Sequence, residues 1–350
     1  MILNTGNRTD IPAFYSRWFW NRLKDSFAMA RNPMATGRIT KFRLDPEVVD
    51  VLSFCTKNPA PMLEEMARQK AVWESGQSAG DNRTVADSES VAKASDPAAD
   101  GAGHNLFAFR QMWHVTITPY GRDIEPYVPP KEDVMQSFRQ LSELVGPQCT
   151  AWRYDPIFLS ETYDIDFHLR TFEEMAQALE GATHQCIISF IDLYEKTKRN
   201  FPEARRLTAE EEAVLAKGIA ASGARHGMKI YACCEDKALA RYGIDVDGCM
   251  AKEGLESAFD ITLDVPKGQQ ISRPICKCLL GSDIGAYNTC GHGCRYCYAN
   301  YDRRTVEINM VAHDPDSPLL VGWPQPEDII TDARQESYYS GQITIGFWGF

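Results

Sequence analysis

The chain has 350 residues, of which 44% are hydrophobic and 24% charged, and its formal net charge is −11. This is the composition of an ordinary globular protein, long enough for one large domain or two small ones. No apolar run approaches the ~18 residues of a membrane span, and the acidic balance disfavours a broad nucleic-acid-binding surface. The first ten residues carry no basic segment followed by an apolar core, so we expect a cytoplasmic protein with reduced thiols.

Short apolar runs alternate with helical patterns up to about residue 245. The predicted strands are 1–4, 48–55, 113–118, 149–153, 186–191 and 228–233, and the predicted helices are 11–30, 60–75, 131–144, 172–179 and 208–224. Such alternation indicates a parallel sheet with right-handed crossovers. Six βα units are too few for a complete eight-stranded barrel. We therefore predict an α/β fold in which residues 1–245 form a partial parallel (βα)6 TIM-like barrel.

Residues 76–105 interrupt this pattern. The segment is rich in Ala, Ser, Asp and Gly and contains no aromatic residue. It cannot bury enough apolar surface to offset the entropy of ordering it. We interpret it as a disordered insertion in a loop.

Polar residues follow each predicted strand. In a parallel barrel the chemistry lies at the carboxyl ends of the strands, so these residues should form the rim of one pocket. Asp10 fits this rim or a simple helix cap equally well. The candidate catalytic residues in these clusters are Arg8, Lys57, Arg153 and Asp155.

Three cysteines fall within eight residues, in the run CGHGCRYCYANY: Cys290, Cys294 and Cys297. Three thiolates can hold three irons of a [4Fe–4S] cluster and leave the fourth iron open to a small molecule. A zinc site is the alternative, with His292 or a distant residue as fourth ligand. His292 lies on a tight loop between two cysteines, a cramped place from which to join the same metal. We therefore predict the cluster.

The other cysteines divide into two groups. Cys55, Cys149 and Cys186 lie inside predicted strands and should be buried, small hydrophobic residues. Cys276 and Cys278 form a CxC pair in a loop, and with Cys249 and one of Cys233 or Cys234 they would supply four thiolates for a second [4Fe–4S] cluster or a zinc ion. We expect only one of Cys233 and Cys234 to join, because adjacent side chains diverge on an extended strand. Residues 246–350 would thus form an iron–sulfur segment and tail packed on the barrel mouth.

The spacing of Cys290, Cys294 and Cys297, with Tyr296 before the last cysteine, is similar to the motif of the radical S-adenosylmethionine (SAM) enzymes. The YCY continuation most resembles the spore photoproduct lyase branch. The resemblance implies that Tyr296 belongs to the cofactor site, that SAM binds the open iron, and that a flavodoxin or ferredoxin supplies electrons. Arg8, Lys57, Arg153 and Asp155 would orient SAM or an unknown substrate, for which a nucleic acid is suggested only by the YCY analogy.

The chain as a whole resembles a bacterial family known as domain of unknown function 1848. The phrases that carry the resemblance are NRTDIPAFYSRWF, TKNPAPML, TITPYGRDIEP, WRYDPIFL, SFIDLYEKTKR and DIGAYNTCGHGCRYCYANY. They run from residue 2 to about residue 322, apart from the insertion. Family members usually have an arginine and a tryptophan where this chain has Asn7 and Cys55. Two hypotheses follow: a radical-SAM-like enzyme, or a metal protein with a redox or binding role and no catalysis.

Overall fold

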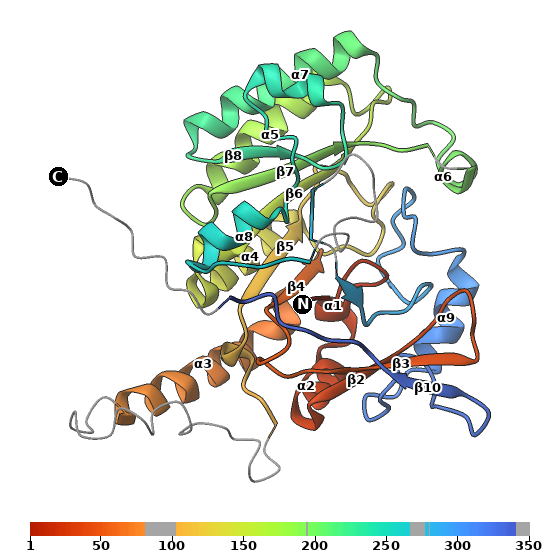
Figure 1. The fold of residues 1–350 in the computed structure, drawn as a ribbon. Helices are drawn as coiled ribbons and strands as arrows, with labels where there is room; N and C mark the ends of the chain where they lie inside the picture. Colours follow the sequence, from red (N-terminus) through yellow and green to blue (C-terminus); the bar gives the residue numbers. More distant parts are fainter. Residues whose placement is uncertain (81–102, 194, 267–276, 280, 341–350) are drawn as a thin grey trace, which may run out of the picture.

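The computed structural model describes residues 1–80, 103–193, 195–266, 277–279 and 281–340. Its main element is a sheet of seven strands, most of which are labelled in Figure 1. The strands stand in the order β8-β7-β6-β5-β4-β1-β9, and each described pairing in this sheet is parallel. They are β1 (Ile2–Asn4), β4 (Val51–Thr56), β5 (Gln111–Thr116), β6 (Thr150–Ile157), β7 (Gln185–Phe190), β8 (Lys229–Ala232) and β9 (Ser282–Asp283).

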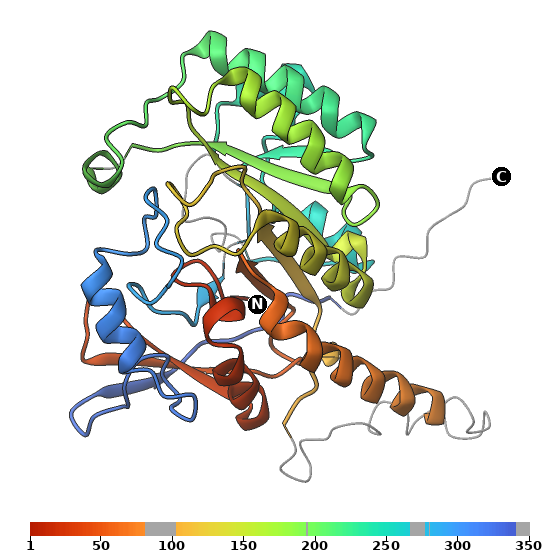
Figure 2. The same ribbon diagram turned by 180° about the vertical axis from the view of Figure 1, so that it is seen from behind.

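Helices cover one face of this sheet (Figure 2). Right-handed crossovers between neighbouring parallel strands place the connecting helices on the same side. Their apolar stripes pack on Leu3, Leu52, Trp113 and Trp152 of the strands. The helices are α1 (Ile11–Phe14), α2 (Ser16–Asp25), α3 (Ala60–Gly80), α4 (Lys131–Val145), α5 (Ile165–Leu179) and α7 (Ala209–Arg225).

The opposite face of the sheet changes character along the strands. Near the strand starts, Ile2, Val51 and Met112 pack against α8 (Lys252–Phe259) and the segments around it. Successive side chains of a strand alternate between faces, so the residues two and four positions later point to the same side. Those residues are polar: Asn4, Ser53, Cys55, His114 and Thr116. This face is therefore apolar where α8 covers it and polar toward the carboxyl ends.

A second sheet contains β2 (Phe27–Arg31), β3 (Arg38–Arg43) and β10 (Ile329–Asp332), in the order β10-β3-β2. The helix predicted over residues 11–30 is wrong at its end. The backbone of Ser26 turns into the left-handed region with φ of 61°, and β2 begins at the next residue. Alternate burial along β2 and its antiparallel pairing with β3 outweigh the helical pattern of the sequence.

Two helices are longer than predicted, and the remaining elements are short. Helix α5 begins at Ile165, where Asp164 caps it, well before the predicted start at residue 172. Helix α3 extends to Gly80, into the predicted insertion, and residues 81–102 lie outside the described residues. The short elements are η3 (Leu106–Ala108), η4 (Pro147–Cys149), α6 (Glu195–Asn200), η5 (Lys237–Tyr242) and α9 (Arg303–Val311).

All six predicted strands and their parallel arrangement are confirmed, but the expected barrel is not. The sheet is open, with β8 at one edge and β9 at the other. The segment after residue 245 adds β9 to the main sheet and β10 to the small one. None of the helices in the described part of the chain combines the length and the apolar character that crossing a membrane requires.

Candidate functional site

A cavity of about 500 Å³ lies at the carboxyl ends of the parallel strands. This volume falls within the range of about 300–1,000 Å³ that is usual for small-molecule sites. Of the predicted catalytic residues, Lys57, Arg153 and Asp155 line the cavity. Arg8 lies outside the lining, with its guanidinium 5.6 Å from the centroid of the Tyr287 ring.

Cys290, Cys294 and Cys297 all line this cavity. They belong to the cysteine loop, by which we mean residues 286–299. The sulfur of Cys290 accepts the backbone N–H of His292, and burial raises the pKa of this thiol well above its ordinary value. Burial likewise raises the pKa of Cys294 to about 12, although Lys57 opposes the shift. Within the described residues, no group of three or more Cys, His, Asp or Glu side chains is arranged to hold a single metal ion.

Two glycines allow the cysteine loop to pack closely. A Cβ atom on Gly291 would lie 2.8 Å from the Phe14 ring, and one on Gly293 would lie 2.9 Å from the Tyr127 ring. Gly293 also has a φ of +70°, which only glycine adopts readily. The CGHGC sequence therefore fits the loop between α1 and the segment after β5.

Asp10 fastens the cysteine loop to the start of α1. Its carboxylate caps the helix by accepting the backbone N–H of Ala13 at 3.0 Å. The same carboxylate accepts the backbone N–H of Lys57 at 2.7 Å and lies 2.8 Å from Nε2 of His292. Both interpretations of Asp10, as a helix cap and as a pocket residue, are therefore correct. The buried His292 ring anchors the loop to Asp10.

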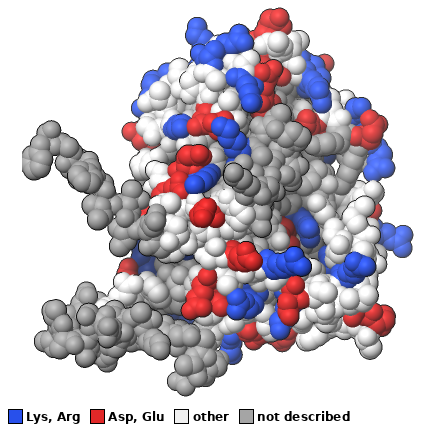
Figure 3. All heavy atoms as spheres, in the orientation of Figure 1, with Lys and Arg blue, Asp and Glu red and all other residues white. Residues whose placement is uncertain are grey.

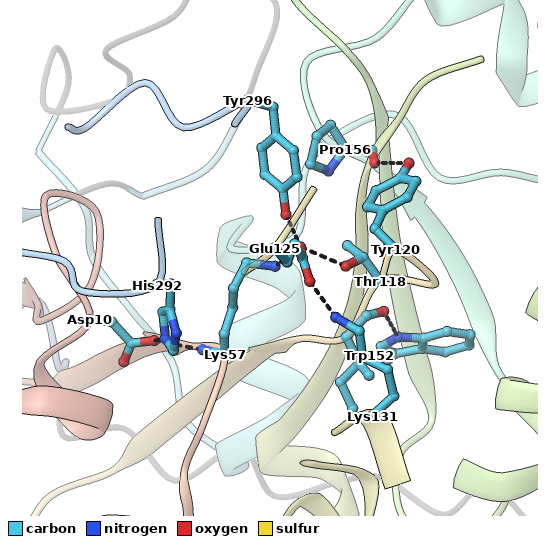
Figure 4. A network of polar contacts seen from close by, with 11 residues as sticks. Asp10, Lys57, Thr118, Tyr120, Glu125, Lys131, Trp152, Pro156, His292 and Tyr296 are labelled. Atoms are coloured by element: carbon cyan, nitrogen blue, oxygen red, sulfur yellow. Dashed lines mark hydrogen bonds and ion pairs between the residues drawn. The ribbon is translucent and has the colours of Figure 1, made fainter. Parts of the chain in front are cut away.

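Glu125 is the centre of a buried polar network (Figure 4). The Glu125 carboxylate accepts hydrogen bonds from Lys57 Nζ and from Thr118 Oγ1, each at 2.7 Å. Lys131 and the Tyr296 hydroxyl donate to it as well. Through Tyr296 the cysteine loop is therefore joined to the segment that follows β5.

Positive charge exceeds negative charge in this network, because the two lysines share one carboxylate. Burial disfavours the ionised form of Glu125, but Lys57 and Lys131 outweigh it and hold the pKa of Glu125 at about 2. Burial lowers the pKa of Lys131, whereas Glu125 raises that of Lys57 despite its burial. A surplus positive charge thus lies close to Cys294. Glu125 and Lys131 were not among the site residues predicted from the sequence. The only feature that could have indicated them was an acidic residue in the loop before α4.

Arg153 and Asp155 form an ion pair in the cavity wall, and the Ser189 hydroxyl donates to Asp155. A second carboxyl, that of Glu235, accepts the backbone N–H of Phe190 at 2.8 Å and also lines the cavity. Burial raises the pKa of Glu235 to about 8. It is therefore largely protonated at neutral pH and can donate a hydrogen bond to a ligand. Glu235 comes just after the predicted strand 228–233, so it is one of the polar residues that follow the strands.

A second set of cysteines lines the same cavity: Cys233, Cys234, Cys249 and Cys278, called here the thiol group. Cys249 Sγ lies 3.9 Å from Cys278 Sγ. Hydrogen bonds from Cys234 and Cys249 lower the pKa of Cys233 well below its ordinary value. Cys276 lies outside the described residues.

Cys233 and Cys234 both line the cavity. That only one of them joins a metal site stays a prediction, but the reason given for it is wrong. The prediction assumed that the strand continues through them, but β8 ends at Ala232 and Cys234 has a left-handed φ of 61°. This turn brings the two adjacent side chains to the same side.

Cys149 and Cys186 are buried away from the cavity, as expected. Cys55 is only half-buried and lines the cavity, so its assignment as a core residue is wrong. Its Sγ lies 3.8 Å from Nδ1 of His114. His114 is 2% exposed, and burial lowers its pKa to about 3, so the ring is neutral. The position of His114 on the polar face of β5 was the one feature of the sequence that pointed to a role in the site.

A family model described as a domain of unknown function (DUF1848) matches residues 2–75 and 92–299. The chain belongs to this family. The DUF1848 match contains all the cysteines that line the cavity, and it omits residues 76–91, which lie within the predicted insertion. No curated protein and no solved structure matches the chain significantly.

Proposed function

We propose that this member of DUF1848 is a radical-SAM-like enzyme in which Cys290, Cys294 and Cys297 hold a [4Fe–4S] cluster. The open iron would face the cavity, where SAM and a further substrate bind. One observation carries the proposal: the three motif cysteines line a single cavity together with Lys57, Arg153 and Asp155. Such a cavity offers both a metal centre and polar groups for a small molecule.

Three motif cysteines suit a cluster with one open iron better than a structural zinc ion, which prefers four protein ligands. Thiolates that share one zinc ion lie roughly 4 Å apart, because each metal–sulfur bond is near 2.3 Å. The cysteines of a cubane lie roughly 6 Å apart, because four irons separate them. The three cysteines are near enough for their charges to interact.

The charges near Cys294 also support a cluster. A [4Fe–4S] cubane with three thiolate ligands is an anion, and nearby cations and N–H groups stabilise it. Lys57 and Lys131 supply the surplus positive charge, and the backbone N–H of His292 donates to Cys290. The sequence motif and its surroundings therefore agree.

When reduced by a flavodoxin or ferredoxin, a bound cluster of this kind would supply the electron that cleaves SAM. The remaining work falls to the side chains of the cavity. Arg153, fixed by Asp155, would bind a carboxylate or phosphate, and Lys57 would add positive charge beside it. Positive and negative side chains are interspersed on the face shown in Figure 3, which favours a small substrate over a nucleic acid.

The test is SAM cleavage by the full chain after anaerobic reconstitution with iron and sulfide. With dithionite as reductant, we expect 5′-deoxyadenosine from the wild type and from a Cys149→Ala control, whose cysteine lies outside the cavity. The variant in which Cys290, Cys294 and Cys297 are all Ala should form none. A wild type that binds the cluster and leaves SAM intact would contradict the enzymatic proposal. It would point to the alternative, a redox or binding protein that holds metal.

A further inference from the structure

We propose a second and separate site in which Cys233, Cys249, Cys278 and His114 bind a single thiophilic metal ion of the zinc class. Three thiolates with one imidazole are a common donor set for zinc. The four residues line the cavity described above. This site does not depend on the cluster proposal, because it shares no ligand with the cysteine loop.

The spacing of the sulfurs points to one ion and not to a second cubane. Cys249 Sγ and Cys278 Sγ lie 3.9 Å apart, and two thiolates on one tetrahedral zinc lie roughly 3.8 Å apart, given bonds near 2.3 Å. The Cys233 thiol hydrogen-bonds to that of Cys249. The three sulfurs thus form a continuous row, although 45 residues separate Cys233 from Cys278 in the sequence.

His114 is an independent indication of a ligand. Its side chain is 2% exposed, and its Nε2 atom has no hydrogen-bond partner among the described residues. A buried polar atom without a partner is uncommon and calls for an explanation. His114 lines the same cavity as the thiol group, and the charges of Cys278 and Cys233 act on its ring. A metal ion at the thiols would give Nε2 its missing partner.

The surroundings suit thiolates. The backbone N–H of Met250 donates to Cys278 Sγ at 3.3 Å, and the guanidinium of Arg153 lies 3.8 Å from Cys249 Sγ. Both groups stabilise negative charge on sulfur. A divalent ion with three thiolates keeps a net negative charge, which Arg153 would partly balance.

The site also accounts for the path of the chain between β8 and β9. This part of the described chain contains only η5, α8 and isolated bridges, one of which joins Ala251 to Cys278. Metal ligation would tie such a segment down, because binding free energy contributes directly to folding. The donors do not yet enclose one point, so binding would bring Cys233 and His114 toward the Cys249–Cys278 pair.

Cobalt titration tests the site directly, because thiolate-bound Co²⁺ gives intense charge-transfer absorption. We expect the metal-free, reduced full chain to bind one equivalent of Co²⁺ with this absorption, and Zn²⁺ to displace it. The Cys290/Cys294/Cys297→Ala variant and the Cys149→Ala control should behave like the wild type. The Cys249→Ser/Cys278→Ser variant should lose the signal.

His114→Gln separates a ligand from a merely structural residue, because it should keep the far-UV circular dichroism of the fold and weaken Co²⁺ binding at least about tenfold. Failure of the wild type to show the absorption would overturn the inference, even if the cysteine variants do not fold. Loss of the signal in the Cys290/Cys294/Cys297→Ala variant would overturn it as well. So would a Cys249–Cys278 disulfide in the anaerobically purified chain.

Discussion

The cysteine loop and the thiol group occupy one cavity, but they are assembled in different ways. The cysteine loop gathers three cysteines within eight residues and is fastened by Asp10 and Glu125. The thiol group gathers cysteines from the turn after β8 and from two later segments, and a histidine on β5 lines the same cavity. The cysteine loop is therefore specified by the local spacing of its cysteines, whereas the thiol group is specified by how the strands are ordered in the fold. We therefore expect a change in the Glu125 network to damage the first region and to spare the second.

The largest effect should come from Glu125→Gln. The substitution leaves Lys57 and Lys131 without their shared carboxylate, and breaking a buried ion pair costs about 3–5 kcal/mol. Both lysines are mostly buried, with 13% and 21% of their side chains exposed. Urea unfolding followed by circular dichroism measures the loss. Reconstituted iron should fall with it, whereas Co²⁺ binding by the folded variant should persist.

Glu65→Gln is the matched control. Glu65 pairs with Arg68 on the surface of α3, where ion pairs contribute about 0–1 kcal/mol. Equal losses of stability in the two variants would show that the buried network has no special role. Loss of Co²⁺ binding in the folded Glu125→Gln chain would show that the two regions form one unit.

The pH dependence of the same network sharpens the comparison. The folded chain lowers the pKa of Glu125 from its ordinary 4.5 to about 2. A lowered pKa stabilises the fold while the carboxyl is ionised, so this contribution is complete above about pH 4.5 and disappears as the pH falls toward 2. At 1.36 kcal/mol per unit, the contribution is about 3 kcal/mol.

The difference in unfolding free energy between wild type and Glu125→Gln should therefore be constant from pH 6 to 8 and shrink below pH 4.5. Urea titrations of both chains at pH 7, 4 and 3 measure it. A difference that stays the same at pH 3 would mean that Glu125 is not held ionised by the two lysines.

A smaller effect is expected from Gly293→Ala. The added methyl group meets the Tyr127 ring, and the φ of +70° strains any other residue. The expected cost is about 1–3 kcal/mol in urea unfolding. Gly254→Ala in α8 is the control, since its Cβ meets no atom within 4 Å and alanine favours a helix. If both variants are equally stable, the close packing of the cysteine loop is not a constraint.

The sequence predicted those parts of the fold whose signals are local. Alternating apolar runs and helical patterns located six of the seven strands of the main sheet, and the spacing of Cys290, Cys294 and Cys297 marked the cysteine loop. The polar residues after the strands located the cavity, because parallel strands end at one edge. Strand β2 was missed because its antiparallel pairing with β3, which also pairs with the distant β10, overrides a helical pattern.

The rest of the site depends on contacts that spacing cannot reveal. Glu125 and Tyr296 are far apart in the sequence and meet only after the loop following β5 folds over the cavity. His114 on β5 and Cys233, which follows β8, line the same cavity although they are far apart in the sequence. The orientation of Cys234 depends on a left-handed turn that an alternating pattern does not predict.

The most direct test of the central claim is the iron and acid-labile sulfide content of the anaerobically reconstituted chain, measured with electron paramagnetic resonance after reduction. We predict four irons and four sulfides per chain, a reduced cubane signal that changes when SAM is added, and loss of both the iron and the signal when Cys290, Cys294 and Cys297 are replaced by Ala. A wild-type chain that takes up zinc and no iron, or iron that remains in the triple variant, would contradict the account.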